Sequence, residues 1–218
     1  MIVSMWMSRD VVSVAADTPI VEAAHLMARR RIRRLPIVAP PGERLVGVVT
    51  ATDLLHAYPP DVNPFAVDAG APGRSLTRVG DLVRHEPVTV RPDDPIEAAA
   101  ALMCERKVGG LPVVRDGHLV GVITESDVFR AFVSLFAAER AGLRVTFDAS
   151  ACAHPFAAVA ALAADQPLEV KSLVLSCQHD VPVCVVRVEG AGGAAFVEAL
   201  WRAGHRVLNV LAVGPGAS

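Results

Sequence analysis

The chain has few of the features that are typical of proteins that bind nucleic acid or membranes. Only 5% of its 218 residues are aromatic, and 21 Lys and Arg residues nearly balance 23 Asp and Glu residues. Such a chain has no general attraction for nucleic acid or an anionic membrane, so any phosphate site has to be local. It lacks a basic leader and any apolar run long enough to span a bilayer. We therefore expect a cytoplasmic protein that binds neither nucleic acid nor a membrane.

Features of catalytic and metal sites are also scarce. The four cysteines, Cys104, Cys152, Cys177 and Cys184, form no C-x-x-C pair, so we expect small buried apolar side chains. There is no phosphate-binding glycine loop, no nucleophile elbow and no cluster of metal ligands, and the seven histidines are scattered. These absences favour a binding protein over an enzyme, with no catalytic residue, no metal and no required cofactor.

What the chain does contain is a long internal repeat. The stretch from Asp17 to Val38 recurs without a gap from Asp93 to Val114, with about half of the positions identical. The segment LVGVVTATD, ending at Asp53, returns as LVGVITESD, ending at Asp127. Two copies of one supersecondary unit indicate two similar folds packed against each other. The seam between the copies is therefore the first place to expect a ligand.

Each copy predicts a β-α-β-β-α unit. A short β-branched run is followed by an acid, a proline and an amphipathic helix, with Asp17 and Asp93 or Asp94 as N-cap candidates. Two strands and a second helix follow, and Asp116-Gly117 is a typical hairpin turn. We expect repeat 1 at residues 1–58, a Pro- and Gly-rich connection at 59–75, and repeat 2 at 76–140.

The remaining segment, residues 141–218, has a different pattern. It predicts strands at 143–147, 168–177, 183–188 and 207–213, with helices at 155–164 and 194–203. The order β-α-β-β-α-β is that of the ferredoxin-like split βαβ arrangement. The expected fold class is thus α/β (α+β), with two repeats in a pseudo-two-fold pair and a C-terminal ferredoxin-like domain.

The strand-to-helix junctions carry the strongest local signal. Thr50 precedes Asp53 by three residues, as Thr124 precedes Asp127, which nearly matches a helix capping box. Capping alone would explain the pattern. A helix N-terminus with a hydroxyl and an aspartate also offers donors for phosphate and an acceptor for a ribose diol.

The repeated run of helix, L-P-hydrophobic-V and L-V-G-V-hydrophobic-T-x-x-D resembles the CBS domain, and two in tandem resemble a CBS pair, or Bateman module. The resemblance covers about two thirds of the chain. It implies a cleft that binds AMP, ADP, ATP, S-adenosylmethionine or a related adenosine ligand. It also implies that the T-x-x-D aspartate holds the ribose hydroxyls, with the hydroxyl residue near the phosphate.

The resemblance gives two potential sites, one at Thr50 and Asp53 and one at Thr124 and Asp127. It places the two residues before Leu-Pro opposite the T-x-x-D of the other copy. Arg33 and Arg34 would then approach Asp127 with charge suited to phosphate, whereas Gly109 and Gly110 would leave space beside Asp53. We expect the Asp127 site to take the phosphorylated ligand. Val12 and Val88, in the runs that open the repeats, complete the predicted set.

Residues 141–218 resemble an ACT domain in element order and in the AFVEALWRAGHRV segment. ACT domains that bind amino acids carry glycine in the turn after the first strand, and Phe156 stands there instead. A CBS pair followed by an ACT-like domain resembles the acetoin-utilization CBS–ACT proteins, which implies regulation in acetoin or acetyl-CoA metabolism.

We expect a regulatory, non-enzymatic homodimer whose nucleotide occupancy modulates a partner enzyme or the dimer itself. Two alternatives remain open: a dimerisation scaffold with empty clefts, and an amino-acid sensor that uses the ACT-like domain.

Overall fold

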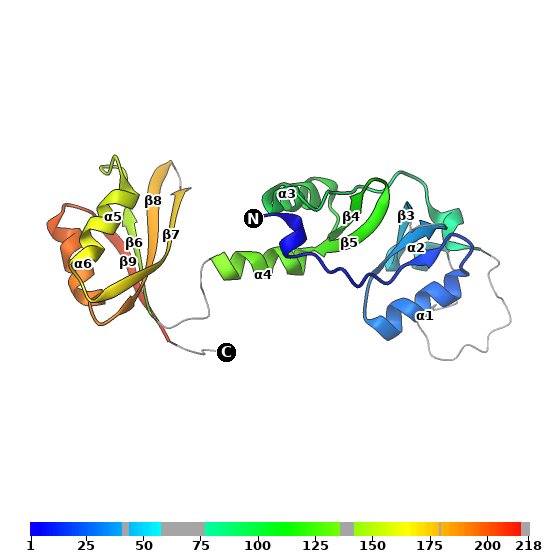
Figure 1. Ribbon diagram of the computed structural model, residues 1–218, viewed down its shortest axis with the longest axis horizontal. Helices are drawn as coiled ribbons and strands as arrows, with labels where there is room; N and C mark the ends of the chain where they lie inside the picture. Colours follow the sequence, from blue (N-terminus) through cyan, green and yellow to red (C-terminus); the bar gives the residue numbers. More distant parts are fainter. Residues whose placement is uncertain (41–43, 58–76, 136–141, 179, 215–218) are drawn as a thin grey trace. The chain divides into compact units, whose positions relative to one another are not determined.

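The computed structural model describes residues 1–40, 44–57, 77–135, 142–178 and 180–214. The predicted connection at 59–75 lies outside these residues. The chain divides into two compact units, Met1–Phe129 and Arg130–Ser218. Each is described by itself below (Figure 1).

The N-terminal unit contains both repeats. Repeat 1 is built from β1 (Val14–Ala15), α1 (Ile20–Arg30), β2 (Arg34–Ala39), β3 (Arg44–Thr50) and α2 (Ala51–Ala57). Repeat 2 is built from α3 (Ile96–Arg106), β4 (Gly110–Arg115), β5 (His118–Thr124) and α4 (Glu125–Leu135), the last of which continues beyond the unit. Short 3₁₀ turns lie at Val3–Met5 and Val79–Leu82. The strands that open the repeats are shorter than predicted. Repeat 1 has only the two residues of β1, and repeat 2 has only an isolated bridge between Val90 and Val113.

One five-stranded sheet, in the order β1-β2-β3-β5-β4, joins the repeats. The two hairpins have the same register, with Arg34 opposite Thr50 and Gly110 opposite Thr124. Each has an irregularity at the equivalent place, between Ile37 and Val38 and between Val113 and Val114. The sequence repeat is therefore also a repeat of backbone geometry.

The predicted helix faces form the core. Ile20, Ala23, Ala24 and Met27 of α1 are buried in the core of repeat 1, where α1 contacts β2. Ile96, Ala99 and Met103 of α3 are buried in the same way in repeat 2, where α3 contacts β4. Both helices end on a residue in the left-handed region, Arg31 at φ 54° and Lys107 at φ 53°. The turn residue Asp116, at φ 53°, and Gly117, at φ 82°, make the predicted hairpin connection.

The predicted aspartate N-caps are wrong. Pro19 and Pro95 are the N-cap residues, and neither helix has a side-chain cap. Each proline is extended at ψ near 140°, and the helix begins at the isoleucine that follows it. Asp94 instead accepts a hydrogen bond from the backbone N–H of Arg91 at 2.7 Å.

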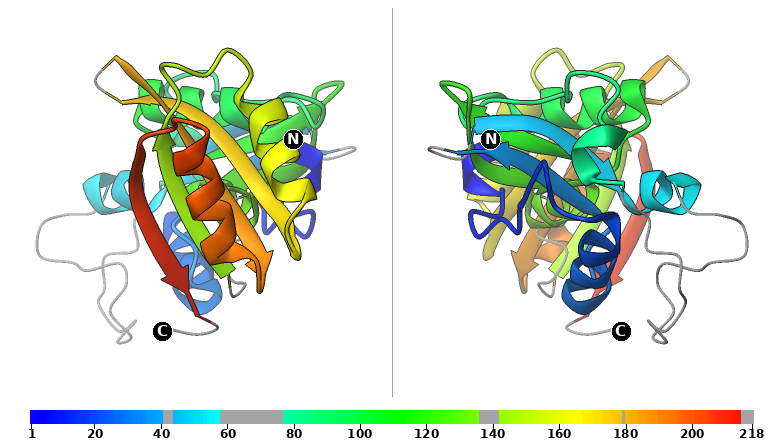
Figure 2. Two further views of the ribbon diagram at one scale, coloured as in Figure 1. Left: turned by 90° about the vertical axis from the view of Figure 1, so that its left-hand side faces the viewer. Right: turned by 90° about the vertical axis from the view of Figure 1, so that its right-hand side faces the viewer.

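The C-terminal unit contains the second sheet. Its elements are β6 (Gly142–Asp148), α5 (Pro155–Ala164), β7 (Leu168–Gln178), β8 (Val181–Gly190), α6 (Gly193–Arg202) and β9 (Val207–Val213). The β-α-β-β-α-β order is the predicted one, and the antiparallel strands lie in the order β7-β8-β6-β9. Helices α5 and α6 lie side by side on one face of this sheet (Figure 2). Phe147, Val186, Phe196 and Leu200 lie in the core between the two layers.

The expectation of four buried cysteines is correct only in part. Cys184 is buried in the second core, Cys152 is partly exposed, and Cys104 and Cys177 are exposed. Burial, with a smaller contribution from Cys152, raises the pKa of Cys184 to about 11.

We predict a matching order of thiol reactivity. The thiolate is the reactive form, so Cys184 stays protonated and unreactive at pH 8, whereas Cys104 and Cys177 react quickly with a disulfide reagent. Counting thiols released from the native protein checks this. Cys177→Ser removes one fast-reacting thiol and Cys184→Ser removes none. A fast-reacting thiol lost in Cys184→Ser would contradict the prediction.

Candidate functional site in the repeat unit

The two T-x-x-D segments are helix caps. Thr50 donates from its backbone N–H and its Oγ1 to Asp53 Oδ2, at 2.8 and 2.6 Å, and Asp53 N–H returns a bond to Thr50 Oγ1 at 3.2 Å. Thr124 makes the same two bonds to Asp127 Oδ2, at 2.8 and 2.6 Å. The capping interpretation is therefore correct. It holds each threonine side chain in one orientation at the end of its strand.

The two caps differ in burial. Asp127 is only 2% exposed, whereas Asp53 is partly buried. The Asp127 carboxylate is thus removed from water. Its hydrogen bonds are stronger in the protein interior than they would be in water. This difference already breaks the symmetry of the repeat.

A cavity of about 210 Å³ contains residues of both repeats. Four predicted site residues line it: Val12 and Arg34 of repeat 1, and Gly110 and Thr124 of repeat 2. Most of the other lining is apolar, and its residues are Ser8, Asp10, Val11, Ile32, Pro36, Val48, Leu111, Pro112 and Val122. The structure therefore brings the arginine of one copy to the threonine of the other, as the resemblance implies.

Arg34 is the cation of this cavity. Partial burial lowers its pKa, the neighbouring Arg33 lowers it further, and Glu125 of α4 raises it. The guanidinium still remains charged at any physiological pH. A partly desolvated, permanent positive charge suits the recognition of a phosphate group.

Gly109 makes room for this arginine. A Cβ at Gly109 would lie 2.6 Å from Arg34 Nη2 and 2.8 Å from Glu125 Oε2. The guanidinium and the carboxylate therefore converge over the glycine. The space at Gly109 is filled by the side chains of Arg34 and Glu125, and the expectation that Gly109 leaves space beside Asp53 stays a prediction. Gly110 lies opposite Thr124 of its own repeat.

The remaining predicted residues do not line the cavity. Thr50 and Asp53 form the helix cap of repeat 1, and Arg33 is exposed. Val88 and Asp127 are also absent from the cavity lining. Sequence reasoning missed Glu125. The signal for it was the difference inside the T-x-x-D segments, where repeat 1 has Ala51 and repeat 2 has Glu125.

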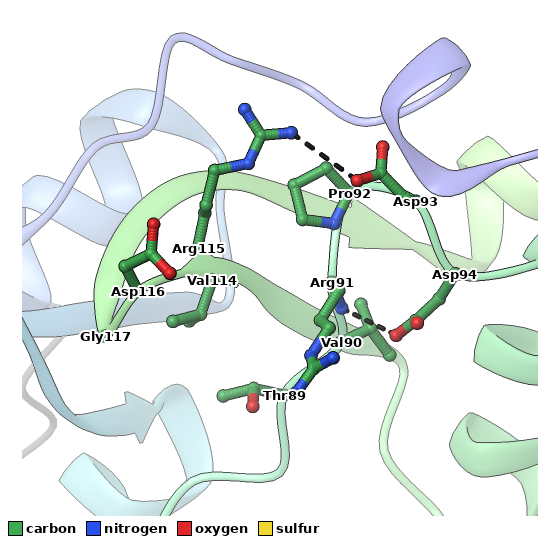
Figure 3. Close-up of a pocket in the computed structure, with 10 residues that line it drawn as sticks. All are labelled: Thr89, Val90, Arg91, Pro92, Asp93, Asp94, Val114, Arg115, Asp116 and Gly117. Atoms are coloured by element: carbon green, nitrogen blue, oxygen red, sulfur yellow. Dashed lines mark hydrogen bonds and ion pairs between the residues drawn. The ribbon is translucent and has the colours of Figure 1, made fainter.

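A larger cavity, of about 620 Å³, lies at the hairpin-turn end of repeat 2 (Figure 3). It is lined by residues 89–94 and 114–117, which include Arg91, Asp93, Asp94, Arg115 and Asp116. Arg115 is ion-paired with Asp93 at 3.8 Å, and both side chains are exposed. Because these charges offset one another in water, this cavity is a weaker candidate for an anion. No group of three or more metal-ligating side chains occurs among the described residues.

The sequence profile of the CBS domain matches residues 3–60 and 79–134. The chain belongs to the CBS domain family. These two segments are the two repeats that share the sheet and the Arg34–Thr124 cavity. No helix within the described ranges is long and apolar enough to cross a membrane.

Solved CBS structures are similar to the same part of the chain. AcuB from Vibrio cholerae, whose name refers to acetoin utilization, is 28% identical with a TM-score of 0.52, over 63% of this chain and 93% of that one. CBSX2, solved in complex with AMP, is 28% identical with a TM-score of 0.52, over 62% and 98%. The CBS pair of MJ0100, solved with 5-methylthioadenosine and S-adenosyl-L-methionine, is 25% identical with a TM-score of 0.50, over 62% and 97%.

Among curated relatives, inosine-5'-monophosphate dehydrogenase from Korarchaeum cryptofilum is 33% identical over 122 residues. The match covers 56% of this chain but only 22% of that enzyme. The similarity therefore extends over a fifth or so of the relative's length.

We predict that removing one cap destabilises the repeat unit. Asp53→Ala leaves the Thr50 N–H and Oγ1 without their acceptor, and the free energy of unfolding should fall by about 1 kcal/mol. Urea denaturation followed by circular dichroism measures this change. Thr52→Ala, at an exposed position of the same helical turn, is the control and should change stability little. Equal effects of the two variants would contradict a capping role for Asp53.

Proposed function

We propose that this protein is a regulatory module that binds AMP, ADP, ATP or a related adenosine ligand in the cleft between its CBS repeats. The observation that carries the proposal is the shared cavity, in which Arg34 of one repeat lies with Thr124 of the other. The AMP complex of CBSX2 and the S-adenosyl-L-methionine complex of MJ0100 support an adenosine ligand.

Each side chain has a role that its geometry favours. Thr124 donates its hydroxyl hydrogen to Asp127, so its oxygen is oriented to accept a hydrogen bond from a ribose hydroxyl. Asp127, which is buried outside the cavity lining, holds this orientation. Arg34 provides the donors for the phosphate, and the exposed Arg33 extends the positive charge outward.

A phosphate in this cavity competes with Glu125 for Arg34. The cavity, at about 210 Å³, is smaller than the roughly 300–1,000 Å³ of usual ligand pockets. A phosphate that takes Arg34 away from Glu125 both enlarges the site and frees a carboxylate at the start of α4. Because the ligand then interacts differently with the two arrangements, it shifts their equilibrium, as a regulatory switch requires.

We predict that AMP raises the melting temperature and that this gain depends on Arg34. Arg34→Gln should weaken AMP binding about 10- to 100-fold, as expected for one charge-assisted contact, and leave the weaker binding of adenosine unchanged. Gly109→Ala should act in the same direction, because its Cβ displaces the Arg34 guanidinium. Glu125→Gln should tighten AMP binding by removing the competitor.

Calorimetry with AMP, ADP, ATP, S-adenosylmethionine, NAD and adenosine measures these affinities. Asp127→Ala should abolish binding, and Asp53→Ala, the matched change in the other repeat, should retain it. If no adenosine compound binds, the scaffold with empty clefts replaces the sensor. If instead a branched-chain amino acid stabilises the protein, and changes at His154 remove that effect, sensing belongs to the C-terminal unit.

For the C-terminal unit we propose an ACT-like, ferredoxin-like fold, supported by its element order and by two helices on one sheet face. A site at Phe156 receives little support, since this side chain is 57% exposed at the start of α5. The similarity to AcuB supports a role in acetoin or acetyl-CoA metabolism. We propose that the protein acts on a partner enzyme and is not itself an enzyme.

We further predict a homodimer that uses α4. Phe129 is 68% exposed, Phe132 57% and Leu135 54%, and their three-residue spacing places them along one side of the helix. Exposed apolar clusters of this kind mark interaction sites. Sedimentation velocity at micromolar concentration should show a dimer.

Phe129→Ser combined with Phe132→Ser should shift the population to monomer. Phe156→Ser removes an equally exposed phenylalanine from α5 and should leave the dimer intact. A wild-type monomer, or equal dissociation in both variants, would refute an α4 interface.

A further inference from the structure

Arg187 lies on the sheet face of the C-terminal unit that α5 and α6 do not cover. Successive residues of a strand point to opposite faces, and Val186 and Val188 belong to the core beneath the two helices. Arg187, between them on β8, therefore points to the other face. It is nevertheless only 1% exposed, and it is the largest of the fully buried side chains.

This guanidinium has no hydrogen-bond acceptor. None of its Nε, Nη1 and Nη2 atoms has a partner among the residues that the structure describes. Arginine cannot lose its charge by deprotonation inside a protein. A buried charge without a counter-ion is strongly unfavourable, and native structures rarely contain one.

The carboxylates on the neighbouring strand positions are already engaged. Glu189 follows Arg187 by two residues on the same face, and Glu169 lies opposite Glu189 on β7. Lys171 binds both, through its Nζ at 3.5 Å from Glu189 Oε2 and through an ion pair with Glu169. Two carboxylates thus share one lysine, and the arginine beside them has neither.

A second arginine faces the first. Arg144 of β6 is the direct cross-strand partner of Arg187, and two like charges in this position repel. Gly142, two residues before Arg144, lies beside the buried side chain, because its Cβ position would be in van der Waals contact with Arg187 Nε at 3.7 Å. The nearest cross-strand neighbour of the buried guanidinium is therefore another cation and not a counter-ion.

We propose that Arg187 and Arg144 together hold a small oxyanion, a phosphate or carboxylate group, as a counter-ion on this sheet face. A planar guanidinium binds such a group through two parallel hydrogen bonds. One anion between two arginines satisfies the buried donors and turns the repulsion into attraction. Only 1% of Arg187 is exposed, so a flat surface of a partner protein cannot place an acceptor against it. An anion of a few atoms can reach the guanidinium during local opening of the fold.

Thermal unfolding of the full chain tests the proposal. After dialysis into sodium chloride, the protein is titrated with inorganic phosphate or acetate at constant ionic strength. We expect the melting temperature of the wild type to rise by several degrees, and that of Arg187→Met to stay constant. In chloride alone, Arg187→Met should melt at or above the wild-type temperature, because it removes an unpaired buried charge.

Three controls separate the possible outcomes. Arg34→Gln should keep the full oxyanion response, which distinguishes this site from the proposed nucleotide site. Glu189→Gln should also keep it, and Arg187→Lys, which retains the charge but not the two-pronged geometry, should keep only part of it.

Equal gains in wild type and Arg187→Met would overturn the proposal. So would a large loss of stability in both Arg187→Met and Glu189→Gln in chloride, since Glu189 would then be the counter-ion. A melting temperature that rises with protein concentration instead of with oxyanion would assign the acceptor to a second copy of the chain and also exclude the small-anion site.

Discussion

The cross-strand register of the two hairpins is the constraint on which the rest of the N-terminal unit depends. It places the residue before Leu-Pro opposite the threonine that ends the returning strand, in both repeats. The threonine is then held by the aspartate of its own cap. A slip of one residue would turn every side chain of the hairpin to the opposite face, and it would bury polar groups in place of Leu35 and Leu111. Hydrophobic burial therefore fixes the position of the polar groups at the cleft.

Within that common frame, charge makes the copies unequal. Arg34 and Gly110 occupy equivalent positions, as do Ala51 and Glu125. Repeat 1 thus contributes a cation, Arg34, and repeat 2 contributes both the Glu125 carboxylate near it and Gly109, which makes room for the guanidinium. The proposed sensing depends on this pair of charges, because a bound phosphate would compete with the Glu125 carboxylate for the Arg34 guanidinium.

Much of this architecture could be predicted from the sequence, because periodicity and repetition report on burial. The faces of α1 and α3, the Asp116-Gly117 turn and the element order of the C-terminal unit follow from such patterns. The pairing of Arg34 with the Thr124 cavity came from the family resemblance. The positions of Glu125 and Arg187 could not be predicted, since they depend on which long side chains meet after folding. The N-caps were wrongly assigned because an acid before a proline satisfies the same pattern without capping the helix.

The left-handed ends of α1 and α3 have a consequence for how this protein can change. Arg31 and Lys107 both adopt the left-handed conformation, which glycine and asparagine favour and which strains a residue with a long side chain. Neither residue lines the cleft cavity. Replacing Arg31 or Lys107 with glycine should therefore stabilise the fold. Such a gain in stability could offset the loss caused by a substitution elsewhere that alters ligand preference.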